Sequence, residues 1–182
     1  MLIEKEIKII LTNEQYEYLM NTFDWEPVFE QINHYYGSNI YSDSNITIRI
    51  RENNGYKLQV KIPKSIEGSL HIKEEYEIKV DGICSKINRK TLQNLTGYSF
   101  DEDKELLGEL ITKRRICNAY KDIQIALDEN DYLEIKDYEI EIEYINEYPK
   151  VIIEKLKALD IDISKEVKGK HSRFIERLKL IK

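Results

Sequence analysis

Cysteine, proline and glycine are scarce in this chain of 182 residues, which has 2 Cys, 3 Pro and 7 Gly. Cys84 and Cys117 are too few and too far apart for a disulfide framework or a zinc site, so we expect buried thiols in a reducing compartment. With so little Pro and Gly, no segment has the composition of a linker or a low-complexity tract, and no fixed-period repeat is present. Residues 1–182 are therefore expected to fold as a single domain.

Long apolar runs and an excess of basic residues are also missing. No run approaches the roughly 20 residues that a membrane-spanning helix needs, and the first residues lack the apolar stretch of a signal peptide. We therefore expect a cytoplasmic protein without a membrane partner. The net charge of −6 excludes a general electrostatic attraction to nucleic acid, so any polyanion has to bind a local basic cluster.

Charged residues, by contrast, are abundant, and the first strand shows how they are used. They make up 34% of the chain, above the usual share of about 25%. Glu4, Glu6 and Lys8 alternate with Lys5 and Ile7, and alternate side chains of a strand share one face. Two carboxylates beside an ammonium group suit a divalent cation next to phosphate.

Similar alternation along the chain predicts eight strands and four helices. The strands are expected at about residues 2–11, 30–37, 45–52, 55–62, 69–81, 107–120, 122–128 and 137–146. A tight turn is expected at Asn53-Asn54-Gly55. One helix is expected to begin after Thr12, which forms a capping box with Gln15, and a second to begin near Ser85 and end at Gly97. A third is expected to begin near Pro149. A last helix is expected to carry Phe174, Ile175, Leu178 and Ile181. Eight strands with peripheral helices indicate an α+β fold, as an antiparallel barrel or a curved sheet.

The charges of the predicted strands are sorted by sign. Arg49 and Arg51 share one face, whereas Glu141 and Glu143 share another. The ordinary interpretation is a sheet with its charged faces in water, but like charges at neighbouring positions on one face repel. If the sheet closes with its apolar face outward, helices cover that face and the charges line an interior passage. Because desolvated charge is costly without compensation, the expected ligand is a compact polyanion with divalent cations.

These residues also carry a resemblance to a known family. Glu4-Lys5-Glu6-Ile7-Lys8 matches the ExExK signature of the CYTH superfamily, or triphosphate tunnel metalloenzymes, and the layout is similar to its short bacterial members. The resemblance continues, in the family's order, through Arg49-Ile50-Arg51, Lys61, Glu75-Tyr76-Glu77, Lys113-Arg114-Arg115, Asp128, Glu141-Ile142-Glu143 and Lys170.

The resemblance implies an eight-stranded antiparallel β-barrel whose tunnel binds a triphosphate. It implies Mg²⁺ or Mn²⁺ held by Glu4, Glu6, Glu141 and Glu143. It implies phosphate binding by Lys8, Arg49, Arg51, Lys61, Lys113, Arg115 and Lys170. Finally, it implies that Glu75, Glu77 and Asp128 lie where a second metal or the reacting water is positioned.

We therefore expect metal-dependent hydrolysis of inorganic triphosphate by a monomer or homodimer. A nucleoside or thiamine triphosphatase, an adenylyl cyclase and a polyphosphate-binding module without turnover remain alternatives. The cyclase alternative is disfavoured because no His-Phe element precedes ExExK. Separately, Tyr35-Tyr36-Gly37 departs from the family's Tyr-Tyr-Asp, so the role of that Asp is not carried over to this chain. Stacking of a base on aromatic residues such as Trp25, Tyr35 or Tyr36 stays open. Surface or packing roles are expected for His34, His71 and His171, and Glu139 is expected to lie too far along its strand to contact metal.

Overall fold

The computed structural model describes residues 1–38 and 45–182, in which the strands form one closed antiparallel sheet. The strands are β1 (Leu2–Leu11), β2 (Phe29–Gly37), β3 (Thr47–Glu52), β4 (Tyr56–Glu67), β5 (Leu70–Val80), β6 (Lys86–Ile87), β7 (Lys104–Tyr120), β8 (Ile123–Tyr132) and β9 (Ile135–Tyr144). The helices are α1 (Asn13–Leu19), α2 (Arg89–Thr96), α3 (Lys150–Ala158) and α4 (Lys170–Ile181).

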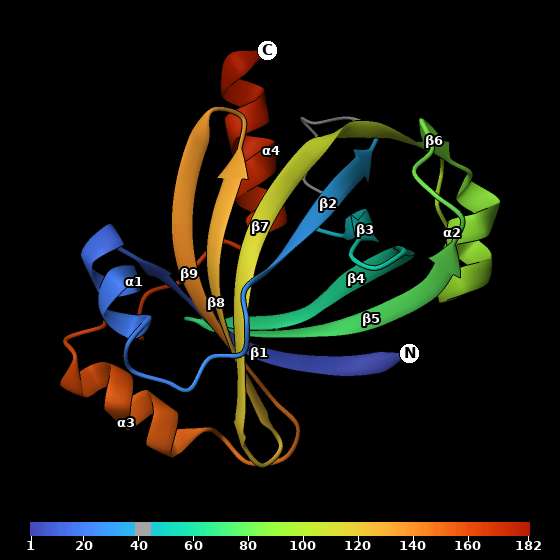
Figure 1. Ribbon diagram of the computed structural model, residues 1–182. Coiled ribbons are helices and arrows are strands. Elements are labelled where there is room, and N and C mark those ends of the chain that lie inside the picture. Colours follow the sequence, from blue (N-terminus) through green and yellow to red (C-terminus); the bar gives the residue numbers. More distant parts are fainter. Residues whose placement is uncertain (39–44) are drawn as a thin grey trace.

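Eight of these strands close into the predicted barrel (Figure 1). Their order is β2-β3-β4-β5-β1-β9-β8-β7, and β2 also pairs with β7. The short β6 pairs with the N-terminal end of β7 and lies outside the closed ring. The α+β barrel expected from the sequence is therefore confirmed. In the described residues, no helix is long and apolar enough to span a membrane.

The local signals at chain reversals are mostly confirmed. The Thr12 capping box forms, with the Gln15 N–H donating to Thr12 Oγ1 over 3.2 Å. Gly97 ends α2 with a φ of 78°. Ser85 as the cap of α2 is wrong, because Asn88 caps it through Oδ1 and the Lys90 N–H at 2.8 Å. Residues 86–87 are held extended by β6 pairing, so the helix begins later.

The apolar faces of the strands point out of the barrel and are covered by helices. Figure 1 shows α1 and α3 on one side of the barrel and α2 on the other. Beneath α1 and α3, buried Ile7 and Ile142 pack with residues such as Leu156. Beneath α2, Val60 packs with Leu92. This arrangement confirms the expectation that the charged faces point inward.

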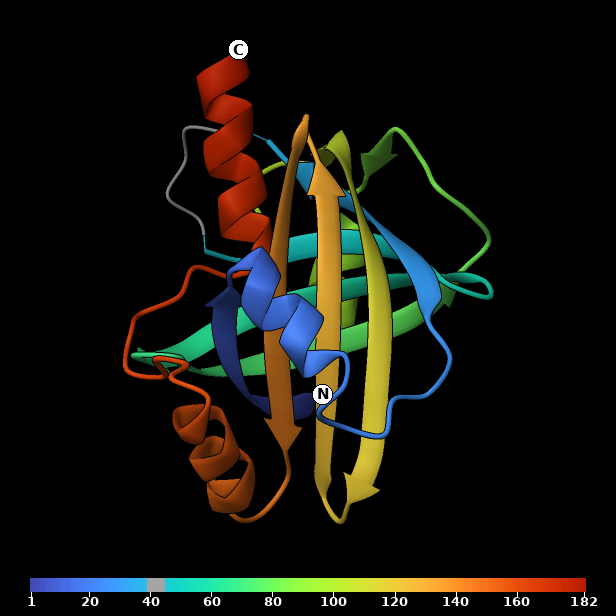
Figure 2. The ribbon, with the colours of Figure 1, turned by 60° about the vertical axis from the view of Figure 1, so that its left-hand side comes forward.

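Helix α4 differs from the others because it packs against one end of the barrel (Figure 2). Its Phe174 is fully buried in a cluster with Tyr35, Leu110 and Tyr132, from β2, β7 and β8. The segment before the helix is tied to the β4–β5 hairpin, since Ser69 Oγ donates to the Ile163 carbonyl over 2.8 Å. The first turn of α4 is thereby fixed beside the barrel interior.

Close packing of α4 on β7 depends on Gly108, which has a φ of 150° and would place a Cβ 2.9 Å from Phe174 Cζ. We expect Gly108→Ala to lower the free energy of unfolding by about 1–3 kcal/mol, because the core is overpacked and the backbone strained. Urea unfolding measures this. Gly82→Ala is the control, since a Cβ there meets no atom within 4 Å. Equal stability of the two variants would contradict this packing.

Candidate functional site

The barrel interior contains a cavity of about 430 Å³, bordered at one end by the first turn of α4. Glu4, Glu6 and Lys8 all line it, so the predicted common face of β1 is confirmed. Its cationic residues are Lys8, Arg49, Arg51, Lys61, Lys73, Arg114, Lys168 and Lys170. Its carboxylates are Glu4, Glu6, Glu75, Glu141, Glu143, Glu166 and Glu176. The chain as a whole has a net charge of −6, whereas cationic and acidic side chains are nearly balanced in this lining.

Three of the carboxylates form a group that can hold a metal ion. Glu4, Glu6 and Glu143 each offer an oxygen within 4.8 Å of the other two. Burial, together with the Glu4 carboxylate, raises the pKa of Glu143 to about 7. Among the described residues Glu143 has no ion-pair partner. Three carboxylate oxygens grouped in this way, one of them without an ion-pair partner, fit a hard divalent cation such as Mg²⁺ or Mn²⁺.

Lysines pair with the other two carboxylates of this group. Lys61 Nζ lies 2.6 Å from Glu4 Oε1, and Glu6 binds Lys8 at 2.8 Å and Lys73 at 2.5 Å. Burial opposes ionisation of Glu6, but Lys8 and Lys73 outweigh it and hold the pKa of Glu6 far below its usual range. Glu6 is therefore charged at neutral pH, and its partners Lys8 and Lys73 also line the cavity.

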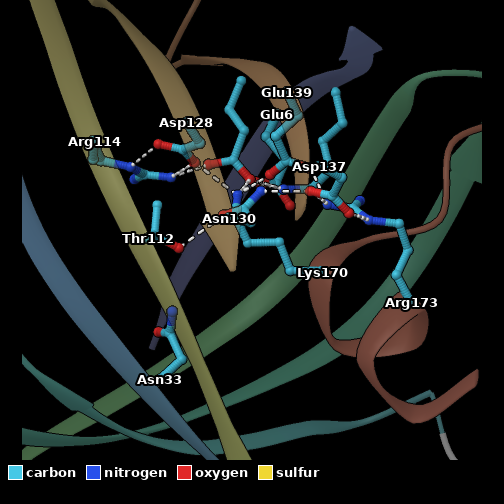
Figure 3. Close-up of polar contacts among 12 residues, drawn as sticks. Glu6, Asn33, Thr112, Arg114, Asp128, Asn130, Asp137, Glu139, Lys170 and Arg173 are labelled. Atoms are coloured by element: carbon cyan, nitrogen blue, oxygen red, sulfur yellow. Dashed lines mark hydrogen bonds and ion pairs between the residues drawn. The ribbon is translucent and has the colours of Figure 1, made fainter. Parts of the chain in front are cut away.

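Glu141 belongs to a second group of buried carboxylates, with Asp128 and Glu139. Figure 3 shows cations reaching into this group: Arg114 binds both Asp128 oxygens, at 2.8 and 2.6 Å, and also contacts Glu141. Lys170 lies 2.7 Å from Asp128 Oδ2 and also contacts Glu139. Burial disfavours the charged form of Glu141, but Lys8 and Arg114 outweigh burial and hold the pKa of Glu141 well below its usual range. The second group is thus neutralised within the protein.

On the opposite wall, two arginines lack such neutralisation. Arg49 Nε donates to Gln59 Oε1 over 2.8 Å and Arg51 Nε to Asn33 Oδ1 over 3.0 Å; both acceptors are neutral amides. No ion pair joins either arginine to a described carboxylate. Burial, with Arg49 and Arg114 nearby, lowers the pKa of Arg51 to about 9, which still leaves it charged at neutral pH. Two guanidinium groups without a carboxylate partner in the described part of the chain are suited to bind an anion, particularly phosphate.

A family model named CYTH domain matches residues 2–173. The chain belongs to the CYTH domain family. A search of curated protein sequences finds no match to it.

Solved structures with the same fold agree with this assignment. The adenylyl cyclase candidate HpAC1 from Hippeastrum, described as having a dominant triphosphatase activity, shares 20% identity at a TM-score of 0.74, with 95% of each chain covered. A conserved hypothetical protein from Pyrococcus furiosus shares 18% identity at a TM-score of 0.60, with coverage of 94% of this chain and 99% of that one. The mimivirus capping enzyme triphosphatase shares 13% identity at a TM-score of 0.52, with coverage of 87% and 86%. At these identities the likeness shows the fold.

Most of the residues implied by the CYTH resemblance meet in the cavity. It is lined by Glu4, Glu6, Glu141 and Glu143 of the metal set, by Lys8, Arg49, Arg51, Lys61 and Lys170 of the phosphate set, and by Glu75. Asp128 is fully buried behind Arg114, and Glu77 lies aside in an ion pair with Lys57 at 2.7 Å. Glu139 belongs to the second carboxylate group and forms an ion pair with Arg173. It is not part of the group formed by Glu4, Glu6 and Glu143.

The expectation that Lys113 and Arg115 face the tunnel is wrong. The Lys113 side chain is 56% exposed beside Glu129, and Arg115 donates to the Tyr16 hydroxyl over 2.8 Å. Arg114, between them, is the residue that points inward. The strand itself carried the signal, because Cys117 shares the face of Lys113 and Arg115 and is buried in the outer core.

Lys73 is a further cavity residue, outside the phosphate-binding set that the CYTH resemblance implies. It lies two positions before Glu75 on the same face of β5, and it binds Glu6 across the pairing of β1 with β5. The alternation of β5 alone was enough to place it beside Glu75. What the strand pattern did not supply was its distance from Glu6.

The inward position of Arg114 predicts a large difference between neighbouring substitutions. Arg114→Gln leaves Asp128 buried without its bidentate partner, so we expect a loss of about 3–5 kcal/mol in unfolding free energy. Lys113→Gln changes an exposed side chain and should stay within about 0.5 kcal/mol. Urea unfolding of both variants gives the comparison. A loss below about 1 kcal/mol for Arg114→Gln would show that the buried network does not stabilise the barrel.

Proposed function

We propose that this CYTH protein is a metal-dependent triphosphatase and that its substrate is inorganic triphosphate. The observation that carries the proposal is the pairing of two walls across one cavity. One wall holds the Glu4, Glu6 and Glu143 carboxylates, which lack a full set of counter-charges. The other holds Arg49 and Arg51, which lack carboxylate partners among the described residues. A polyphosphate with a bound divalent cation satisfies both walls at once.

Each wall has a distinct part in the proposed reaction. Glu4, Glu6 and Glu143 would hold Mg²⁺ or Mn²⁺, whose chemistry is to polarise phosphoryl oxygens. Arg49 and Arg51 bind oxygens of the triphosphate through planar forks and stabilise the negative charge that develops on them. These contacts position the anhydride and require no protein nucleophile.

The lysines between the walls are suited to exchange partners when substrate binds. Lys8, Lys61 and Lys73 each contact a carboxylate of the metal group. With a cation on those carboxylates, the ammonium groups no longer have to neutralise them, and they can point at phosphate oxygens instead. The barrel interior thus remains close to electrical balance with and without its ligands.

Two neighbours in fold add support at the level of reaction type. The Hippeastrum protein is described as having a dominant triphosphatase activity, and the mimivirus protein is a capping enzyme triphosphatase. Both share the barrel with this chain at 20% identity or less. The common theme of their descriptions is cleavage of a triphosphate, which the two-walled cavity accommodates.

The cavity lining favours inorganic triphosphate over a nucleotide or thiamine compound. Of the Phe, Tyr and Trp residues that the structure describes, Tyr35 alone lines the cavity, and its ring packs against His171 and Phe174. The other aromatic candidates for stacking lie elsewhere. Tyr36 donates to the Cys84 carbonyl over 2.7 Å, and Trp25 Nε1 to the Leu19 carbonyl over 3.0 Å. No free aromatic face is left in the described lining for a base or a thiazolium ring.

The direct test is phosphate release from tripolyphosphate with Mg²⁺ or Mn²⁺, using Glu143→Gln as the variant. This substitution removes a carboxylate that has no ion pair among the described residues, so it strands no buried lysine. We expect kcat/KM to fall by about 10²-fold or more, the scale of losing a group that supports a bound metal or the transition-state charge.

The matched control for that experiment is Glu147→Gln, an exposed carboxylate just beyond β9. It should leave kcat/KM unchanged, since it has no access to the cavity. Phosphate release that survives EDTA or Glu143→Gln would overturn the proposed metal chemistry. Tight binding of tripolyphosphate by the wild-type protein with no product formed would instead establish a binding module.

Substrate choice is tested by kcat/KM values measured side by side on tripolyphosphate, ATP and thiamine triphosphate. We expect tripolyphosphate to exceed the other two by at least about tenfold, because the nucleoside and thiamine groups gain no stacking contact and must displace polar side chains. Cyclic AMP formation from ATP is measured in the same reactions. A higher kcat/KM for ATP, or conversion of ATP to cyclic AMP, would reject inorganic triphosphate as the preferred substrate.

A further inference from the structure

Gln124 of β8 is a neutral side chain in the cavity lining, next to the carboxylates that can hold a metal ion. It is the register partner of Glu143 on β9, and Glu143 is in turn the register partner of Glu6 on β1. Directly opposite residues of an antiparallel pair share a face, with Cβ atoms about 4.5–5.5 Å apart. Gln124, Glu143 and Glu6 therefore form a row at one level of the barrel interior, with Glu143 in the middle.

A chain of hydrogen bonds fixes the orientation of the Gln124 amide. Asn118 Nδ2 donates to Glu26 Oε1 over 2.8 Å, and Gln124 Nε2 donates to Asn118 Oδ1 over 3.1 Å. An ionised carboxylate only accepts hydrogen bonds, whereas an amide has one accepting and one donating side. Because Glu26 accepts, Asn118 presents its NH₂ group to Glu26 and its oxygen to Gln124. The NH₂ group of Gln124 therefore has to face Asn118.

This orientation leaves Oε1 as the free end of the Gln124 amide. No described residue donates a hydrogen bond to it. Asn118, which takes the NH₂ group, is not among the described residues that line the cavity, whereas Gln124 and Glu143 are. Since the nitrogen and the oxygen of an amide point to different sides of its carbon, the oxygen is the polar atom that Gln124 offers to the cavity.

An amide oxygen beside a group of carboxylates is suited to a hard cation. Carboxylate, carbonyl and water oxygens are the ligands that Mg²⁺ and Mn²⁺ prefer. Glu143 is the carboxylate of the metal group that has no ion-pair partner among the described residues. A cation bound to Glu143 has Glu6 on the β1 side and Gln124 on the β8 side. The cavity thus offers oxygen on both sides of Glu143.

We propose that Gln124 Oε1 is a fourth oxygen ligand of the divalent cation that Glu4, Glu6 and Glu143 would hold. This inference rests on the proposed triphosphatase function and adds a neutral ligand to its metal site. Three carboxylates already carry more negative charge than one divalent cation neutralises, so a fourth would repel the phosphates of the substrate. An amide oxygen strengthens the hold on the cation without that repulsion.

Two substitutions separate the oxygen of Gln124 from its hydrogen bond to Asn118. Gln124→Met keeps the length of the side chain but has neither the oxygen nor the NH₂ group. Gln124→Glu keeps an oxygen and loses the NH₂ group. Mn²⁺ binding is measured without substrate, from the EPR signal of free Mn²⁺. We expect Gln124→Met to raise the Kd for Mn²⁺ by about tenfold or more. Gln124→Glu should bind Mn²⁺ at least as tightly as wild type, because its carboxylate replaces the amide oxygen.

Turnover of tripolyphosphate at saturating Mn²⁺ gives a second readout. Gln124→Glu should raise KM by about threefold or more, because its added negative charge faces the polyanion. Tighter metal binding combined with weaker substrate binding is a signature that the loss of a structural contact does not produce. Gln93→Met is the matched control, since Gln93 is exposed on α2 and is not among the described lining residues. Its Kd for Mn²⁺ and its KM should stay at the wild-type values.

The outcomes distinguish this inference from the function on which it rests. If wild-type protein binds Mn²⁺ but releases no phosphate from any triphosphate, the proposed function fails, whereas the Kd values still test Gln124 as a ligand. If Gln124→Met binds Mn²⁺ with the wild-type Kd, the ligand role is rejected. Equal weakening of Mn²⁺ binding in Gln124→Met and Gln124→Glu would also reject it, because the bond to Asn118 would then be the only contribution.

Discussion

Charge compensation inside the barrel is the constraint on which the rest of the structure depends. A carboxylate or ammonium group removed from water is stabilised only by a close partner of opposite charge. Asp128, Glu139 and Glu141 meet this requirement through Arg114, Lys170 and Arg173. The Glu143 carboxylate and the Arg49 and Arg51 guanidinium groups do not meet it among the described residues. The fully paired region gives the barrel a rigid base, and the unpaired region is where ligands complete the balance.

Helix α4 connects these two regions. Lys170, at its first position, contacts Asp128 and Glu141 of the paired carboxylates, while Phe174 anchors the helix in an apolar cluster. The segment just before it supplies Glu166, Val167 and Lys168 to the lining of the cavity. The same short stretch thus borders one end of the cavity and neutralises buried carboxylates. A change at the start of α4 will therefore affect both stability and chemistry.

The outward-facing core explains why a charged interior is tolerated. Most of the apolar burial that stabilises this fold lies between the barrel and its helices, as with Val60 against Leu92 and Ile142 against Leu156. The interior is then free to hold polar side chains, provided that they pair. In the usual arrangement of a small antiparallel barrel the interior is filled with side chains that pack it solid. Here the stabilising contacts and the binding cavity occupy opposite faces of the same strands.

The sequence by itself determined the strand pattern, the barrel and most of the cavity lining, because alternation along a strand assigns each side chain to a face. Glu4, Glu6, Lys8, Arg49 and Arg51 follow from that rule alone. Only the tertiary structure decided that Glu141 pairs with cations apart from the other metal-group carboxylates, and that Lys73 reaches Glu6. These features depend on cross-strand register and on the docking of α4, which join residues far apart in the chain and leave no periodic signal within one strand.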